Sequence, residues 1–94
     1  MDLKVPYKNL SNADDAYRLA CQLITPEYIQ KWKVKADVTR NDDLRVITAN
    51  GKGFTLTLTF KEDAAVVDCD LSFMLKAFKK TILEAISNKL EKNI

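Results

Sequence analysis

The sequence FTLTLTF, residues 54–60, decides the fold, because apolar and threonine residues alternate strictly over all seven positions. Such alternation is typical of a β-strand with one buried and one solvated face. Residues 65–71 alternate in the same way after the polar turn Lys61-Glu62-Asp63. These two segments predict consecutive strands, with the threonines of the first strand on the exposed face of the sheet.

The predicted sheet extends towards the N-terminus. Residues 33–39 alternate as well, and the β-branched run at residues 44–49 stops at Asn50-Gly51, a strong hairpin signal. Four consecutive strands joined by short turns predict an antiparallel meander. Residues 3–7 add a further strand, which Pro6 confines to an edge because proline has no N–H to donate to a ladder.

Two helices precede the meander. Ser11 or Asn12 supplies the cap of a helix over residues 13–24, whose apolar side chains recur at three- and four-residue intervals. The motif Thr25-Pro26-Glu27 combines a cap, a first-turn proline and a first-turn acid, so it restarts a short second helix that ends near Trp32.

A long helix over residues 72–92, with Ser72 as its cap, ends the chain. At 100° per residue its apolar side chains span about 180° of the helix surface, more than the usual stripe of about 100°. We expect the excess to cover the sheet and the first helix together. The alternative is that part of it contacts a partner chain.

These elements predict an α+β domain of order β-α-β-β-β-β-α, whose antiparallel sheet has one face covered by the N-terminal helix and the long C-terminal helix. A chain of 94 residues fits a single domain spanning residues 1–94. The residues expected in its core are Leu19, Leu23, Val34, Val38, Phe54, Leu56, Leu58, Phe60, Val67, Leu71, Leu75, Phe78, Ile82 and Ile86.

The composition excludes several classes of protein. Hydrophobic residues make up 47% and charged residues 30% of the chain, with 2 Gly and 2 Pro, which excludes collagen-like and broadly disordered chains. Apolar runs are short, so we expect neither a transmembrane segment nor a secretory signal, and we expect a cytoplasmic protein. Cys21 and Cys69 are expected to be reduced and to pack in the core.

The sequence offers little for catalysis. It contains no His, the commonest general base and a frequent metal ligand. Asp68 and Asp70 share one face of a strand, but no third ligand lies near them in sequence, so we expect neither a metal ion nor another cofactor. A Ser or Thr nucleophile has no evident base, and Gly51-Lys52-Gly53 is too short for a phosphate-binding loop. We therefore do not expect an enzyme.

The charged residues and the wide apolar arc of the terminal helix indicate the candidate binding residues. The net charge is +2, and basic and acidic segments alternate along the chain, which favours neutralisation within the molecule over binding to nucleic acid. Lys76 and Lys80 belong to a basic patch early in the terminal helix, and Leu83 and Leu90 lie at a margin of its apolar arc. Phe73 falls on the polar side; we expect it to pack in the strand–helix junction, and the alternative is an exposed binding residue. The candidates are therefore Phe73, Lys76, Lys80, Leu83 and Leu90.

The C-terminal sequence VVDCDLSFMLKAFKKTILEAISNKLEKNI, residues 66–94, follows the hairpin ANGKGFTLTLTF. Together they resemble a small bacterial family, the polyhydroxyalkanoic acid system proteins. Members carry a threonine-rich strand after a glycine-containing turn, and a Leu-x-Phe-Leu-Leu segment that opens a terminal helix. Leu71-Ser72-Phe73-Met74-Leu75 is similar to that segment, and NLSNADDAYRLA, residues 9–20, is similar to the family's first helix.

The resemblance implies a role near polyhydroxyalkanoate granules, and it carries over no catalytic or binding residue. It also implies an arrangement that looks like a reduced helix-grip fold. We expect a non-catalytic accessory protein that associates with a polyester granule surface, a partner protein or a second copy of itself through apolar surface of the terminal helix. The alternative is a module that binds a small apolar ligand such as an acyl chain, against which the small core argues.

Overall fold

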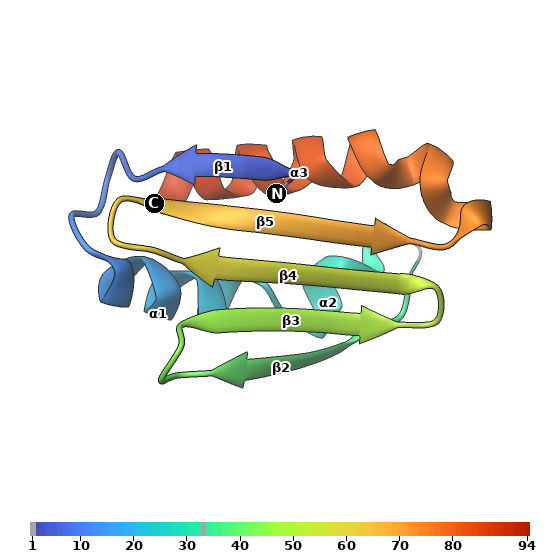
Figure 1. Ribbon diagram of the computed structural model, residues 1–94, viewed down its shortest axis with the longest axis horizontal. Coiled ribbons are helices and arrows are strands. Elements are labelled where there is room, and N and C mark those ends of the chain that lie inside the picture. The colour runs from blue at the N-terminus through green and yellow to red at the C-terminus, as the bar shows by residue number, and fades with distance from the viewer. Residues whose placement is uncertain (1, 33) are drawn as a thin grey trace.

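The alternating segment at residues 54–60 forms the middle strand of a five-stranded antiparallel sheet (Figure 1). The computed structural model describes residues 2–32 and 34–94. The strand order is β1-β5-β4-β3-β2, so the first strand lies at an edge, as predicted. The strands are β1 (Leu3–Pro6), β2 (Asp37–Asn41), β3 (Val46–Gly51), β4 (Phe54–Phe60) and β5 (Ala64–Leu71). The α+β class and the meander β2-β3-β4-β5 are confirmed.

The register of the sheet gathers hydrophobic side chains on one face. Leu58 of β4 pairs with Ile47 of β3 and Val67 of β5, and all three side chains are fully buried. Thr57 pairs with Thr48 and lies on the opposite face, where both side chains are only partly buried. The two faces of residues 54–60 are therefore those that the alternation predicts.

Helices cover the apolar face of the sheet and leave the other face open (Figure 1). Asn12 caps the first of them by accepting a hydrogen bond from the Asp15 N–H at 2.8 Å, and Thr25 caps the second through the Tyr28 N–H at 3.2 Å. Both predicted caps are confirmed. The α-helices in the described part of the chain are α1 (Ala13–Leu23), α2 (Pro26–Gln30) and α3 (Lys79–Asn93).

The terminal helix does not begin where the sequence predicts. Residues 73–78 form a 3-10 helix, η1 (Phe73–Phe78), and α3 follows it. Ser72 makes no side-chain capping bond; its N–H donates instead to the Gly53 carbonyl in the β3–β4 turn at 2.8 Å. The Ser72 carbonyl then accepts from the Leu75 N–H at 2.9 Å, which is the three-residue hydrogen bond of a 3-10 turn.

The tighter helix corrects part of the predicted core. A 3-10 helix has about 3.0 residues per turn where an α-helix has about 3.6, so the arc drawn at 100° per residue does not hold over η1. Phe78, predicted in the core, is 55% exposed, and Met74 is 85% exposed. The other predicted core residues are buried or pack against the core as partly buried side chains, and Cys69 is buried while Cys21 is partly buried.

The connection into the meander differs from the prediction at two points. The predicted strand at residues 33–39 begins at Asp37, and its first residue, Lys33, lies outside the described residues. The β3–β4 turn is Lys52-Gly53, two residues later than the predicted Asn50-Gly51, and Gly53 adopts a φ of 72° that favours glycine. Gly51 serves close approach instead, because a Cβ there would lie 2.2 Å from the Lys35 carbonyl oxygen.

An ion pair ties the N-terminal segment to the start of α3. The Asp2 carboxylate accepts a hydrogen bond from the Cys69 N–H at 2.8 Å and pairs with the Lys79 ammonium at 3.0 Å. The Cys69 N–H and the Lys79 charge hold the pKa of Asp2 below its ordinary value of 3.8. At the other end of α3, a main-chain oxygen of Ile94 accepts from the N–H groups of residues 8–10. Both ends of α3 are thus held by the first ten residues.

The exposure of Phe78 gives a direct test of η1. Phe60→Ala removes a side chain that is 3% exposed and should cost about 3–5 kcal/mol of unfolding free energy. Phe78→Ala removes one that is about half exposed and should cost about 0.7–1.5 kcal/mol, about half of the transfer free energy of a fully buried phenylalanine. Urea melts of the two variants measure the difference, and equal losses would show that residue 78 belongs to the core.

The Asp2–Lys79 pair predicts a pH-dependent stability difference. Because the folded-state pKa of Asp2 is lowered, its interaction stabilises the fold above about pH 4 and is lost as the pH falls through the lowered pKa. Wild type should therefore be more stable than Asp2→Asn at pH 7, and the gap should narrow between about pH 4 and pH 2. Asp43→Asn, in the exposed β2–β3 turn, is the control in urea melts. A gap that stays constant with pH would contradict the assignment.

Candidate functional site

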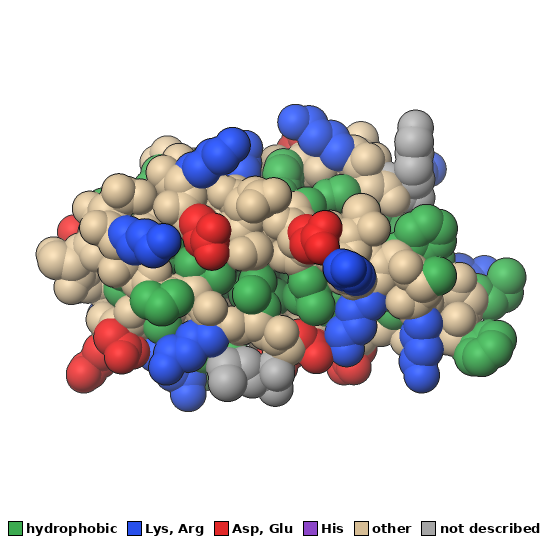
Figure 2. All heavy atoms as spheres, turned by 90° about the horizontal axis from the view of Figure 1, so that it is seen from above, with side chains coloured by type: hydrophobic (Ala, Val, Ile, Leu, Met, Phe, Trp, Pro, Cys, Tyr) green, Lys and Arg blue, Asp and Glu red, His purple; other side chains and the backbone are tan. Residues whose placement is uncertain are grey.

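The 3-10 helix η1 displays large hydrophobic side chains to solvent at one end of the molecule. Phe73 is 89% exposed, Met74 is 85% exposed and Phe78 is about half exposed. We call these three residues the apolar tip. Figure 2 shows hydrophobic side chains gathered at one end of the molecule, the end at which η1 lies in Figure 1.

The base of the tip is fixed to the sheet. The Ser72–Gly53 hydrogen bond holds the start of η1 against the β3–β4 turn, and a Cβ at Gly53 would lie 2.8 Å from the Ser72 hydroxyl oxygen. Leu75, on the inner side of η1, packs against the core. The tip therefore projects from an anchored turn.

Lysines surround the tip. Lys79 pairs with Asp2, and Lys80 lies 4.0 Å from Glu84, one turn later on α3. Lys76 is exposed on η1 itself. Residues 73–83 contain three lysines and no acidic residue, and the carboxylates that lie near Lys79 and Lys80 come from Asp2 and Glu84.

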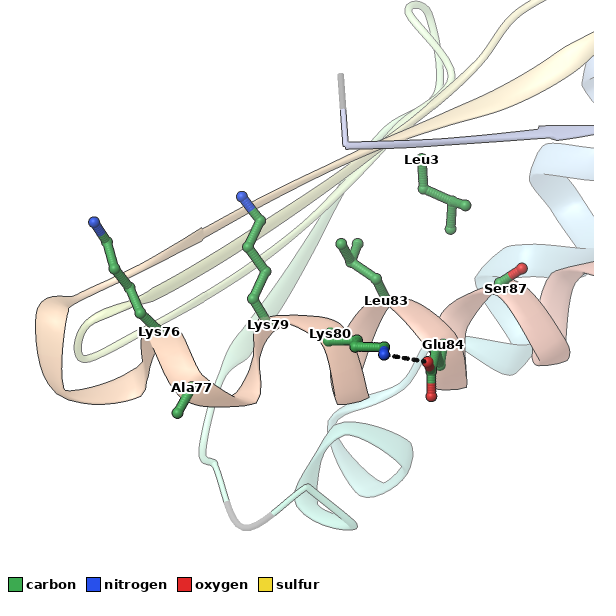
Figure 3. Close-up of a pocket in the computed structure, with 8 residues that line it drawn as sticks. All are labelled: Leu3, Lys76, Ala77, Lys79, Lys80, Leu83, Glu84 and Ser87. Carbon is green, nitrogen blue, oxygen red and sulfur yellow. Dashed lines mark ion pairs between the residues drawn. The ribbon is translucent and has the colours of Figure 1, made fainter.

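A shallow groove runs beside the tip, between β1 and the start of α3 (Figure 3). It encloses about 540 Å³ and has Leu3 and Leu83 on its apolar side, with Lys76 and Lys80 along it. Figure 3 shows Leu3 of β1 facing the side chain of Leu83 across the groove. Glu84, which pairs with Lys80, also lines the groove, so the groove joins an apolar floor to a rim that carries both lysines and a carboxylate.

The structure brings together most of the candidate binding residues, with two corrections. Phe73 does not pack in the strand–helix junction, because η1 turns it outward. Leu90 is fully buried under the sheet and does not belong to the surface, because α3 directs it into the core with Ile86 and Ile94. Lys76, Lys80 and Leu83 line one groove. The sequence assigned Met74 and Phe78 to the arc of an α-helix and so left them out of the site.

A separate apolar cavity lies on the inner side of η1. It encloses about 230 Å³, and the described side chains that line it are all hydrophobic. Trp32 forms one wall and also packs edge-on against Tyr28, with ring centroids 5.2 Å apart. In the sequence, the sign of this cavity was Trp32 itself, a large aromatic residue that the predicted core does not include. The lining residues are Trp32, Val34, Leu71, Leu75, Phe78 and Ile82.

A side-chain hydrogen bond joins α1 to the β2–β3 turn. Tyr17 donates its hydroxyl to the Asp42 carboxylate at 2.6 Å, and burial together with this bond raises the pKa of Tyr17. Among the described residues, no group of three or more His, Cys, Asp or Glu side chains is placed to hold a metal ion. Within residues 2–32 and 34–94, no helix has the length and hydropathy needed to cross a bilayer.

Comparisons with known proteins identify the family. No curated protein and no solved structure matches the chain. Residues 8–94 match the family described as "Putative polyhydroxyalkanoic acid system protein", which covers α1, the meander, η1 and α3. The chain therefore belongs to the polyhydroxyalkanoic acid system protein family.

Proposed function

We propose that the protein is a non-catalytic accessory protein that binds the surface of polyhydroxyalkanoate granules through the apolar tip. One observation carries this proposal. Among the described residues, four large hydrophobic side chains are mostly exposed to solvent. Three of them, Phe73, Met74 and Phe78, lie in η1, and the fourth is Leu44 in the β2–β3 turn. Family membership supplies the granule context. The proposal places the protein in the cytoplasm, with the granules.

The tip has the chemistry of a surface anchor. Phe73 and Met74 contribute little to folding, because they stay in water in the folded protein. Burying each in an apolar polyester surface releases about 1.5–3 kcal/mol, or about 3–6 kcal/mol for the pair. That free energy is available only when the tip finds an apolar partner, so the exposed side chains favour association without favouring the isolated fold.

The lysines around the tip set its orientation. Lys76, Lys79 and Lys80 lie on the same short stretch as the tip, with no acidic residue between positions 73 and 83. Each lysine near an anionic surface contributes about 1 kcal/mol of attraction, and salt screens this term. An anionic coat on a granule would therefore direct η1 towards the surface and speed the approach.

The test is sedimentation of the purified protein with amorphous polyhydroxyalkanoate particles. Phe73→Ser/Met74→Ser should reduce the partition coefficient at least about 100-fold, the value that corresponds to about 3 kcal/mol, and should leave thermal stability nearly unchanged. Leu44→Ser is the matched control, because Leu44 is 67% exposed and belongs to the β2–β3 turn, which lies at the opposite end of the sheet from η1 (Figure 1). Binding of Leu44→Ser should equal that of wild type.

Two outcomes would overturn the proposal. One is a double variant that sediments with the particles as wild type does. The other is that light scattering shows a stable dimer for wild type and a monomer for the double variant, while the double variant still binds granules. That result would make the tip an interface between copies of the chain.

A further inference from the structure

The two edges of the sheet differ in what lies beside them (Figure 1). At one edge, α3 contacts β1 along its length. At the other edge, four of the five residues of β2 are exposed, and within residues 2–32 and 34–94 no strand pairs with its outer side. An edge strand with unpaired N–H and carbonyl groups is a template for pairing with another chain.

The register shows which main-chain groups of β2 face outward. The Phe60 N–H donates to the Arg45 carbonyl at 3.0 Å, and these residues lie directly opposite each other in the β3–β4 register. The main-chain groups of an antiparallel strand face its two neighbours alternately, so Arg45 faces β4 and Thr48 faces β2. Thr39, which is paired with Thr48, then faces β3.

Val38 and Arg40 alternate with the residues that face β3, so their N–H and carbonyl groups point out of the sheet. In the described part of the chain these groups have no hydrogen-bond partner. The edge at β1 is different. The Tyr7 N–H donates to the Asp63 carbonyl, so the next outward position is Pro6, which has no N–H to offer. Proline blocks pairing at β1, and β2 contains none.

We propose that two copies of the chain form a dimer by antiparallel pairing of β2 with β2, so that a single sheet continues across both copies. With Thr39 of one copy opposite Thr39 of the other, the outward groups of Val38 face those of Arg40. A two-fold axis perpendicular to the sheet relates the copies, so the helices of both cover the same face.

Charge selects this register. Centred on Thr39, the pairing sets Asp37 opposite the amide side chain of Asn41, and no like charges lie opposite each other within the strand. Centred on Arg40, it would set two arginines opposite each other and Asp37 opposite Asp43, which is unfavourable.

The ends of β2 complement each other in charge. Lys35 and Lys52 lie beside the start of the strand, and Asp42 and Asp43 follow its end in the exposed β2–β3 turn. Antiparallel pairing brings the lysines of each copy towards the aspartates of the other. This edge therefore matches a second copy of itself.

Light scattering over chain concentrations from about 1 μM to about 1 mM tests the proposal. The mass of wild type should rise from that of one chain to twice that value. Arg40→Pro should raise the dissociation constant at least about tenfold, because it removes an outward N–H from each copy and none that faces β3. Arg40→Ala is the matched control: it keeps the N–H and should dimerise like wild type. A wild type that stays monomeric throughout, or a dimer that Arg40→Pro leaves intact, would overturn the proposal.

Amide hydrogen exchange of wild type gives a second test that does not depend on the folding of Arg40→Pro. The N–H groups of Val38 and Arg40 should be protected in concentrated protein and exchange fast in dilute protein, whereas the Thr39 N–H should be protected in both. Fast exchange of Val38 and Arg40 at both concentrations would contradict the pairing.

The dimer is independent of granule binding, because β2 and the apolar tip are separate surfaces. Phe73→Ser/Met74→Ser should therefore dimerise as wild type does, whether or not it binds polyester particles. A dimer that this double variant dissociates and Arg40→Pro preserves would place the interface at the tip and overturn the proposal.

Discussion

One main-chain hydrogen bond, from the Ser72 N–H to the Gly53 carbonyl, fixes how the chain leaves the sheet. It joins the end of β5 to the β3–β4 turn, where Gly53 has the left-handed conformation. With Ser72 held there, the next residues form a 3-10 turn before the α-helix begins. The position of the apolar tip and the space beneath it both follow from this connection.

The sheet explains why so much of the fold could be predicted. Residues 54–60 alternate because one face of β4 packs under helices and the other stays open, so the pattern in the sequence is the pattern of burial. The caps Asn12 and Thr25 act within three residues, so local sequence also identifies them. In contrast, η1 depends on a hydrogen bond between residues 19 positions apart, and helical periodicity carries no information about it. For that reason Phe78 was assigned to the core.

The candidate site was predictable only in part. The basic patch in the sequence indicated Lys76 and Lys80 as binding residues. A helical projection placed the aromatic side chain of Phe73 on the polar side of the predicted helix. Leu90 was assigned to the surface because a wide apolar arc has no visible boundary in sequence; in the structure the core covers it. The cavity under η1 could not be predicted, because Trp32 and Leu75 meet only after the sheet and the helices have packed.

The tip and the cavity divide one short element between two tasks. The outer side of η1 offers apolar side chains to a surface, and its inner side, through Leu75, closes a cavity against Trp32.

Amide hydrogen exchange of wild type, with and without polyester particles, tests the central claim most directly. The account predicts added protection at residues 73–79 and none at residues 42–45 of the β2–β3 turn. Protection on the open face of the sheet, with residues 73–79 unchanged, would contradict it.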